Sequence, residues 1–580
     1  MSTLMSYPDI EWKYGVIPTG KRIAVDTETT GLNPYQGDKA FLFSFANEAG
    51  EVSVVPRELE YHAMLEKFFA DESITKVFHN AKFDIKMIRE AGFEVKGSIA
   101  DTIVMAKLAD ENEVSYRLKY LCGKYFDYSA VEDERMDNFK KKNKVESYEE
   151  IPEKILHPYA AVDAWNCMLL FHMYLPVAKD FKEMYMMDMQ CLKYLIEIED
   201  RGVLIDKKLA KKLAQDLKKE NLARQKEMKK ITGIKLEPDN NRLLGYAIWD
   251  WGGEIFERTD PSKLHPRGQP KLDKDILPKY VDSIPWMATF IEFKKTKAVI
   301  NSLSNQIIDN LDASNCVHTS FNLSQARTGR FSSSQPNLQN INKTSCVREI
   351  FVPRKGYTFF YFDYSQIEYR LFAYLSGDEK LLEGYRSGEM DMHDDTASNL
   401  RISRDAAKTV NFLMLYGGGV KGLSKKLGIG KGEAAEMLEM FRATTPSLGA
   451  LKDKLLLEWD KNDCIEDPFG KKYHIKRGDE NKIVNTLIQG CACNVLKYTM
   501  LSVRDLIEGE DTYMIQQIHD ENIFEVNNKD MGMIPLIKSC MERVPQIEIP
   551  LVVDVEWSKT NWAEKTKYPM DELKKWTMNE

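Results

Sequence analysis

The sequence lacks the features that would place it in a membrane or in the secretory pathway. Its 580 residues contain no run of eighteen apolar residues, so no segment predicts a membrane-spanning helix and no membrane partner is expected. Asp9 and Glu11 stand early in the chain, where a signal peptide would be apolar and a transit peptide rich in Arg. Internal repeats and low-complexity tracts are also missing, which excludes a repeat protein.

Cysteine is sparse, and none of the nine belongs to a Cys-x-x-Cys pair. Scattered thiols are typical of a reducing compartment, so we expect reduced cysteines and a cytoplasmic location. The apolar content of 43% is ample for a buried core, and the length exceeds what a single core supports. Two or more domains are therefore predicted.

An excess of positive charge is also missing, since the net charge is −8. That total at first opposes nucleic-acid binding, but the distribution of charge matters more than the sum. Residues 207–230 hold ten Lys or Arg against three acids, and residues 401–431 hold seven against one. A solvated helix face would explain one such run. Two runs in an acidic protein favour contact with a phosphate backbone.

Two short strings in the C-terminal half each deliver a carboxylate after an apolar run. They are Phe359–Ser365, which carries Asp363, and Gln516–Phe524, which carries Asp520. Alone, either Asp is more typical of a turn or a helix N-cap. Brought together, the pair would repel unless divalent cations bound between them, as in a two-metal phosphoryl-transfer site.

A third string lies between these two and favours the functional interpretation. In residues 404–417, Arg404, Lys408, Phe412 and Tyr416 recur every fourth position, so on a helix they form one slowly drifting stripe. Cations at one end and aromatic rings at the other suit a triphosphate followed by a sugar and base.

The N-terminal third carries a separate set of acids. Asp26 and Glu28 follow a predicted strand and share one face of it. Asp84 stands four residues after an Asn, and Asp163 stands four after Tyr159, which is helical spacing. Each string alone is more typical of structure. Together, the four acids predict a site for two divalent metals, with Tyr159 orienting an attacking water.

These motifs carry a family resemblance. The three C-terminal strings resemble motifs A, B and C of family A (Pol I-like) DNA polymerases, the Klenow-fragment group, and residues 328–341 and 485–490 support this over about residues 195–580. The N-terminal strings resemble the Exo I, II and III motifs of DEDDy-type 3′–5′ exonucleases over about residues 20–190. Asp101 is assigned to structure.

The resemblance implies an α/β (α+β) protein, in which an RNase H-like exonuclease domain precedes a right-hand polymerase domain. The expected limits are 1–190 for the exonuclease and 191–580 for the polymerase, with the thumb at about 195–315, the palm at about 316–375 and 475–580, and the fingers at about 376–474. Helical patterns dominate 180–230, 286–312 and 378–460, and strand-like alternation marks 512–526 and 548–557. The polar, Lys-rich segment 131–155 predicts a flexible surface connection.

Residue roles follow from the resemblance. Asp363 and Asp520 are expected to bind two metals that activate the primer 3′-hydroxyl and stabilise pyrophosphate. The residues expected at the incoming dNTP are Arg404, Lys408, Phe412, Tyr416, Glu368 and His519. Of these, Lys408 is expected to protonate the leaving group, and Glu368 matches the family's steric-gate position, which excludes a ribose 2′-hydroxyl. The residues expected at DNA are Arg330, Asn337, Gln339, Asn485, Gln489 and Glu521.

The resemblance also implies cofactors and partners. Two Mg²⁺ ions per active site are expected, with Mn²⁺ able to substitute, and the partners are primer–template DNA and dNTPs. Because the segment between the two long thumb helices is short, no thioredoxin dependence is expected. The sequence does not predict whether replisome factors, such as a helicase or a single-strand binding protein, are partners. No 5′-nuclease domain precedes the exonuclease motifs. This predicts a phage-type replicase in the host cytoplasm; the alternative is an organellar or bacterial Pol I-like enzyme.

Three positions depart from the family pattern: Tyr369 stands where Leu is usual, Leu413 where Gly is common, and Asn522 where Leu is common. They put fidelity and rate in question rather than the activity. Three other functions compete with this interpretation. An exonuclease whose second half only clamps DNA would be expected to lack Asp363, Asp520 or Lys408, and all three are present. Glu368 and the exonuclease motifs oppose a single-subunit RNA polymerase, and a non-catalytic scaffold would have no reason to retain the metal- and phosphate-binding residues.

Overall fold

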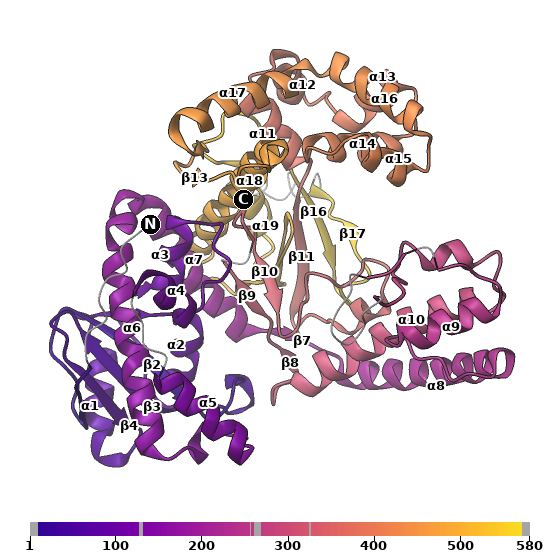
Figure 1. The fold of residues 1–580 in the computed structure, drawn as a ribbon. Coiled ribbons are helices and arrows are strands. Elements are labelled where there is room, and N and C mark those ends of the chain that lie inside the picture. The colour runs from indigo at the N-terminus through magenta and orange to yellow at the C-terminus, as the bar shows by residue number, and fades with distance from the viewer. Residues whose placement is uncertain (1–9, 127–130, 256, 260–267, 324–325, 571–580) are drawn as a thin grey trace.

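The computed structural model describes residues 10–126, 131–255, 257–259, 268–323 and 326–570. An N-terminal domain lies beside a larger C-terminal domain in which a central sheet carries a helical arm on one side and a helical cap above it (Figure 1). Across the described residues, no helix is long and apolar enough to cross a membrane.

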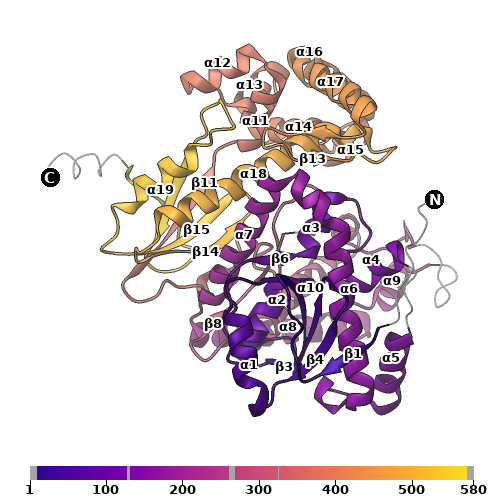
Figure 2. The ribbon, with the colours of Figure 1, turned by 90° about the vertical axis from the view of Figure 1, so that its left-hand side faces the viewer.

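The N-terminal domain is built on a six-stranded sheet in the order β1-β4-β3-β2-β5-β6. Its strands are β1 (Trp12–Tyr14), β2 (Arg22–Thr29), β3 (Ala40–Asn47), β4 (Val52–Pro56), β5 (Thr75–Phe78) and β6 (Ile99–Asp101). The β2–β3 and β3–β4 pairs are antiparallel, and the β1–β4, β2–β5 and β5–β6 pairs are parallel. Helices lie on both faces (Figure 2): α1 (Leu59–Ala70), α2 (Ala81–Glu90), α3 (Thr102–Ala109), α4 (Leu118–Tyr125), α5 (Val131–Asn143) and α6 (Glu153–Asp180).

Alternation along β2 decides where the acids lie. Ile23 and Val25 belong to the core shared with α1 and α2, whereas Ala24 belongs to the core shared with α6. Because successive strand residues point to opposite faces, Asp26 and Glu28 follow Ala24 onto the α6 face.

The connecting helix α7 (Lys182–Arg201) contributes to the cores of both domains, with Leu192 and Ile196 in one and Leu195 and Ile198 in the other. The helical arm follows, formed by α8 (Lys207–Thr232), α9 (Asn241–Asp250) and α10 (Met287–Asn301), with its own core around Trp286 and Phe290. These helices occupy the region predicted to be the thumb.

The central sheet has five strands in the order β14-β15-β11-β16-β17, and all neighbours are antiparallel. The strands are β11 (Tyr357–Tyr364), β14 (Thr512–Ile518), β15 (Glu521–Asn527), β16 (Val553–Ser558) and β17 (Thr566–Lys567). The long helix α18 (Ile483–Leu506) and α19 (Met533–Glu542) pack against it. Below it, β7 (Val203–Leu204) pairs with β8 (Cys316–Val317), and β9 (Ser320–Asn322) pairs with β10 (Ser332–Ser334).

The helical cap above the sheet is formed by consecutive helices and one small hairpin (Figure 1). Its elements are α11 (Ile367–Ser376), α12 (Glu379–Ser387), α13 (Met392–Leu400), α14 (Arg404–Leu415), α15 (Val420–Leu427), α16 (Lys431–Thr444), α17 (Pro446–Asn462), β12 (Ile465–Glu466) and β13 (Lys472–Tyr473). This is the region predicted to be the fingers.

The segment 131–155 differs from the flexible connection predicted for it. Residues 131–143 form α5, which buries Met136. Its first turn carries Glu132, Asp133 and Glu134, and its last turn carries three lysines. Negative charge at the N-terminus and positive charge at the C-terminus interact favourably with the helix dipole, so both ends stabilise the helix. The lysine run that suggested a solvated loop is therefore the C-terminal turn of a helix.

Candidate active sites

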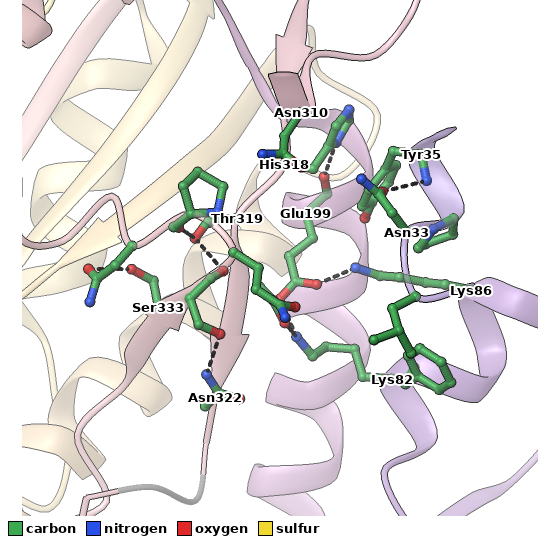
Figure 3. Close-up of a pocket in the computed structure, with 18 of the residues that line it drawn as sticks. Asn33, Tyr35, Lys82, Lys86, Glu199, Asn310, His318, Thr319, Asn322 and Ser333 are labelled. Atoms are coloured by element: carbon green, nitrogen blue, oxygen red, sulfur yellow. Dashed lines mark hydrogen bonds and ion pairs between the residues drawn. The ribbon is translucent and has the colours of Figure 1, made fainter. Parts of the chain in front are cut away.

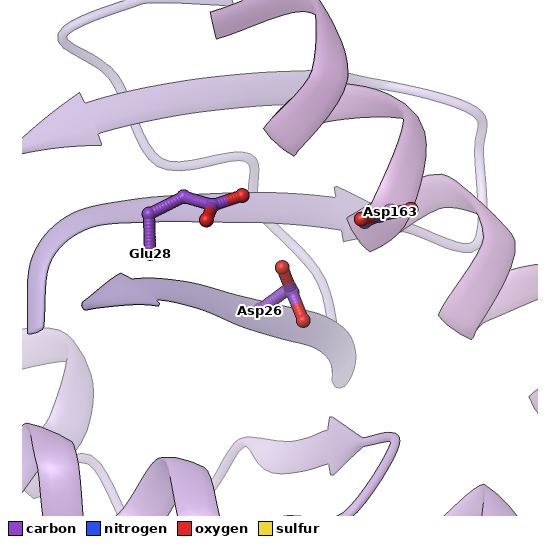
Figure 4. A group of neighbouring side chains, drawn as sticks. All are labelled: Asp26, Glu28 and Asp163. Atoms are coloured by element: carbon purple, nitrogen blue, oxygen red, sulfur yellow. The ribbon is translucent and has the colours of Figure 1, made fainter. Parts of the chain in front are cut away.

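The N-terminal acidic site, defined as Asp26, Glu28, Asp84 and Asp163, lies where β2 meets α6 (Figure 4). One carboxylate oxygen each from Asp26, Glu28 and Asp163 lies within 4.8 Å of the others. Burial raises the pKa of the Asp26 carboxyl well above its usual range, and repulsion from Asp163 and Asp84 adds to the effect. The strand and the helix thus hold together acids that repel one another.

Asp84 stands slightly apart from this cluster. It lies in the first turn of α2, and the Thr27 hydroxyl donates to its Oδ1 at 2.7 Å. Burial raises the pKa of Asp84 to about 8, against the lowering effect of that hydrogen bond. Asn80, expected one helical turn before Asp84, is the α2 N-cap with a φ of 91°. Asp101 caps α3 and accepts from the Ile103 amide, which agrees with its assignment to structure.

Lys119, which the sequence did not single out, reaches into this site from α4. Its Nζ lies 3.4 Å from Asp163 Oδ2 and 3.7 Å from the ring centroid of Tyr159, and it also pairs with Asp133 on α5. Burial raises the pKa of Asp163 to about 6, and Lys119 opposes the rise. No local pattern could have identified Lys119, because its partners are up to 44 residues away (163 − 119).

The C-terminal acidic site, defined as Asp363 and Asp520, forms where a hairpin turn meets the end of β11. The turn between β14 and β15 carries Asp520, and the Tyr364 amide donates to the Asp520 carbonyl at 3.2 Å. The Asp363 side chain still reaches solvent, yet the surrounding protein excludes enough water to raise its pKa to about 7. Repulsion from Glu521 and Asp520 adds to this rise. The fold therefore brings together two acids 157 residues apart (520 − 363).

Glu521, expected at DNA, lies directly across the ladder from Asp363 and forms an ion pair with Lys565. Its carboxylate faces the C-terminal acidic site, so the structure adds a third acid there. A role for Glu521 at DNA stays a prediction.

Four predicted residues meet in one half-buried network beside this site. Arg330 pairs with Glu368, the Tyr416 hydroxyl donates to Glu368 Oε2 at 2.8 Å, and Gln489 bonds to Tyr416. The two partners hold the Glu368 side chain in one orientation, and only 4% of that residue is exposed. A carboxylate fixed in this way can act as a rigid wall.

Helix α14 presents the predicted stripe. Arg404 and Lys408 are exposed, Phe412 and Tyr416 are half-buried, and the two rings lie 5.7 Å apart between centroids. Arg404 pairs with Asp391 at 2.6 Å and with Asp394 at 2.9 Å. Within the described part of the chain, Lys408 has no ion-pair partner within 4 Å.

The remaining predicted residues line the same region. Gln339 donates to the Gln517 carbonyl at 3.0 Å, at the base of the hairpin that carries His519. Asn337 is exposed and accepts from Ser333, and Asn485 Oδ1 on α18 is enclosed without a partner in the described residues.

Packing accounts for two of the three departures from the family pattern. The Tyr369 ring lies 6.1 Å from Phe412, so it supports the stripe from behind. Leu413 fills the space beside Gly418, where an added Cβ would lie 2.5 Å from its Cδ1. Asn522 is fully buried with both amide atoms unpartnered in the described structure, and no contact explains its polarity.

Both acidic sites fit divalent cations by their donor chemistry. Asp163 Oδ1 and Asp520 Oδ1 are buried and have no hydrogen-bond partner among the described residues. Buried carboxylate oxygens without donors are costly unless a cation binds them, and oxygen ligands suit hard divalent ions. The residues that would hold the ions are therefore present at both sites.

A pocket of about 880 Å³ separates the two domains below the central sheet (Figure 3). Its rim is fixed by Glu199 of α7, which accepts from Lys82 at 2.5 Å, from Lys86 of α2 and from the Phe321 amide of β9. Next to it, the rings of Tyr35 and His318 stack at 3.7 Å between centroids. The Glu199 side chain is completely buried, so these contacts join the domains firmly.

The fold agrees with sequence-family comparisons. A profile described as DNA polymerase family A matches residues 207–564, and one described as 3′–5′ exonuclease matches residues 16–176. Since the first match spans more than half of the chain, the protein belongs to DNA polymerase family A, and it carries a 3′–5′ exonuclease domain. Proteins of these two families use divalent metal ions.

Individual relatives share only about a quarter of their residues with this chain. The chain is 26% identical to DNA polymerase I of Pseudomonas aeruginosa over 93% of its length, and 27% identical to that of Chloroflexus aurantiacus over 94%. It spans 63% and 62% of those proteins. A solved structure of the POL domain of Pol1 from M. smegmatis, in complex with DNA primer-template and dNTP, superposes with a TM-score of 0.78 at 22% identity, covering 94% of this chain and 96% of that one. The predicted order, an exonuclease domain followed by a polymerase domain, is confirmed.

Proposed function

We propose that this protein extends a DNA primer from dNTPs under template direction and removes mispaired 3′ ends with its exonuclease domain. The observation that carries the proposal is the presence of two separate acidic sites, each with a buried carboxylate oxygen that lacks a donor. One lies beside a cationic and aromatic stripe suited to a nucleotide, and the other beside a tyrosine suited to orienting water.

At the C-terminal acidic site, the side chains have separate tasks. Asp363 and Asp520 would hold two Mg²⁺ ions, for which Mn²⁺ can substitute; bound there, the ions supply charge neutralisation for the primer oxygen and for the departing pyrophosphate. Lys408 is free to contact the triphosphate and to give a proton to the leaving group. Glu368, held by Arg330 and Tyr416, closes the space that a 2′-hydroxyl would need.

At the N-terminal acidic site, Asp26, Glu28, Asp84 and Asp163 would hold the metals for hydrolysis of the terminal phosphodiester. The Tyr159 phenol is aligned by the Lys119 ammonium over its ring and can orient the attacking water. Roles in DNA replication, in a phage or elsewhere, and independence of thioredoxin stay predictions, as do the assigned domain limits and the cytoplasmic location.

Primer extension by the full chain tests the proposal. With Mg²⁺ present, dNTPs but not NTPs should extend a matched primer, and a mispaired 3′ end should be removed before extension. Omission of the metal should stop both reactions. A chain that bound primer–template but extended it with neither nucleotide would contradict the proposal, and equal use of NTPs would favour an RNA polymerase.

A further inference from the structure

Three buried lysines meet at the junction of the two domains, and we call this group the lysine crevice. Lys107 comes from α3 of the N-terminal domain, Lys471 immediately precedes β13, and Lys497 lies on α18. Their exposed fractions are 6%, 5% and 1%. Lysine is almost never buried to this degree without a partner, so the crevice needs an explanation.

Glycine geometry shows how closely two of these ammonium groups approach. Gly329 has a φ of 81°, and a Cβ added to it would lie 3.0 Å from Lys471 Nζ and 3.8 Å from Lys497 Nζ. Both charges act on Lys107. Burial lowers the pKa of Lys107 to about 8, and repulsion from Lys471 and Lys497 lowers it further. Positive charge therefore converges on the backbone at Gly329.

The surrounding acids leave two of the three lysines without a direct counter-charge. Asp188 forms an ion pair with Lys497 at 2.5 Å, whereas Asp467 bonds to Tyr473 and Asn494, and Glu111 bonds to His474. In the described part of the chain, Lys107 and Lys471 have no carboxylate within 4 Å. Their ammonium groups lie 5.0 and 5.3 Å from the ring centroids of Tyr116 and Tyr473, which offsets part of the cost of burial.

Burial of the crevice is not complete. Small parts of Lys107 and Lys471, 6% and 5% of each residue, remain exposed to solvent. Arg327 lies close enough to add repulsion at Lys107, although it pairs with Asp479 at 3.3 Å. Among the described residues, the ammonium groups of Lys107 and Lys471 have no carboxylate within 4 Å, and such a pair suits a small anion that accepts two hydrogen bonds.

We propose that the lysine crevice binds one phosphodiester group of the DNA, and that Lys107 thereby makes the N-terminal domain part of the grip on primer–template. The inference rests on the proposed function. The position supports DNA as the source of the anion, because Gly329 immediately precedes Arg330, which pairs with Glu368 beside the C-terminal acidic site. Cys493 donates to the Gly329 carbonyl at 2.7 Å and fixes this loop against α18.

Binding of fluorescent primer–template to the full chain, measured by anisotropy in EDTA across a salt series, tests this proposal. Lys107→Met should weaken binding roughly five- to tenfold and lower the slope of log affinity against log salt by about 0.9, the value for one phosphate contact. Lys107→Arg should keep the slope. Lys154→Met, at an exposed lysine of the same domain, is the matched control and should match wild type.

Removal of an unpaired buried ammonium should not lower the melting temperature, so lost binding can be separated from lost folding. If Lys107→Met fails to fold, Lys471→Met probes the crevice from the other domain with the same expected slope. Unchanged slopes in folded variants would overturn the proposal. So would a free-anion site, seen as Lys107-dependent thermal stabilisation by phosphate or pyrophosphate with an unchanged DNA slope. Wild-type primer extension is measured separately: its absence would contradict the proposed function, whereas the binding slopes decide the crevice.

Discussion

The two acidic sites hold similar side chains in different surroundings. In the N-terminal site, Asp26 and Glu28 come from one strand, Asp163 comes from the helix that covers it, and Glu28 and Asp163 are buried. In the C-terminal site, Asp363 and Asp520 come from separate segments, and Asp363 reaches solvent. Under the proposed function, the closed site would admit a single chain end, whereas the open one would admit a duplex and a nucleotide. Exposure thus follows the size of the proposed substrate.

The largest effect should come from removing an acid. Asp363→Ala or Asp520→Ala should lower primer extension roughly 10³-fold or more and leave 3′ digestion unchanged, because several kcal/mol of charge stabilisation are lost at one site only. Asp26→Ala combined with Glu28→Ala should do the reverse. Both activities are measured on one end-labelled primer. Near-normal extension by either single variant would show that the C-terminal acids are not the metal ligands.

A pH experiment tests whether the exclusion of water from the N-terminal acidic site also holds at the neighbouring His79. His79 Nε2 donates to the Tyr116 carbonyl at 2.8 Å, and burial lowers the His79 pKa to about 4. In the unfolded chain the His79 pKa is near its ordinary value of 6.5. Between pH 4 and pH 6.5, His79 therefore carries a proton in the unfolded chain but not in the folded one. Stability is therefore complete above pH 6.5 and falls as the pH drops towards 4, by up to roughly 3 kcal/mol.

Thermal melting from pH 7 to pH 4.5 measures this loss. Wild type should lose more stability over that range than His79→Gln, which cannot take up the proton. Parallel curves for the two proteins would show that His79 already meets enough water to be protonated in the folded state.

Lys119 tests whether the N-terminal site depends on a cation supplied by the protein. Lys119→Met should reduce 3′ digestion roughly tenfold, as is usual when the partner of a metal ligand is removed, because Asp163 and the Tyr159 ring lose their common contact. Lys119→Arg should restore much of the rate, and primer extension should not change. If Lys119→Met digested the 3′ end faster than wild type, the lysine would instead compete with the metal. Tighter Mn²⁺ binding to Lys119→Met than to Lys119→Arg would show that competition.

The smallest effect concerns the strand beside the C-terminal site. Asn522 buries an amide without partners, so Asn522→Leu should stabilise the protein by about 1 kcal/mol through loss of an unsatisfied polar group. Calorimetry compares it with Asn522→Ala, which removes the amide but leaves a cavity and should gain less. A lower melting temperature for Asn522→Leu would indicate that the amide has a bound partner, such as an ordered water.

The sequence predicted what local patterns encode. Strand alternation placed Asp26 and Glu28 on one face. Recurrence at every fourth residue placed Arg404, Lys408 and the two aromatic rings on one stripe of α14. Partners set by tertiary contact were not predictable. Lys119 reaches Asp163 only because α4 packs beside α6, and nothing in the string around Lys119 indicates that. The helix α5 was missed because its closing lysines resemble a solvated loop, although its acidic first turn marked a helix start.

The buried contacts of Glu199 have a consequence for the partition between synthesis and editing. Because Glu199 joins α7, α2 and β9 through buried contacts, we expect the two acidic sites to keep a fixed separation. Under the proposed function, the DNA rather than a domain would then move, and a primer end would reach the exonuclease site only after separating from the template. Because a mispair frays more often than a matched pair, the distance between the two sites would then favour removal of mispaired ends.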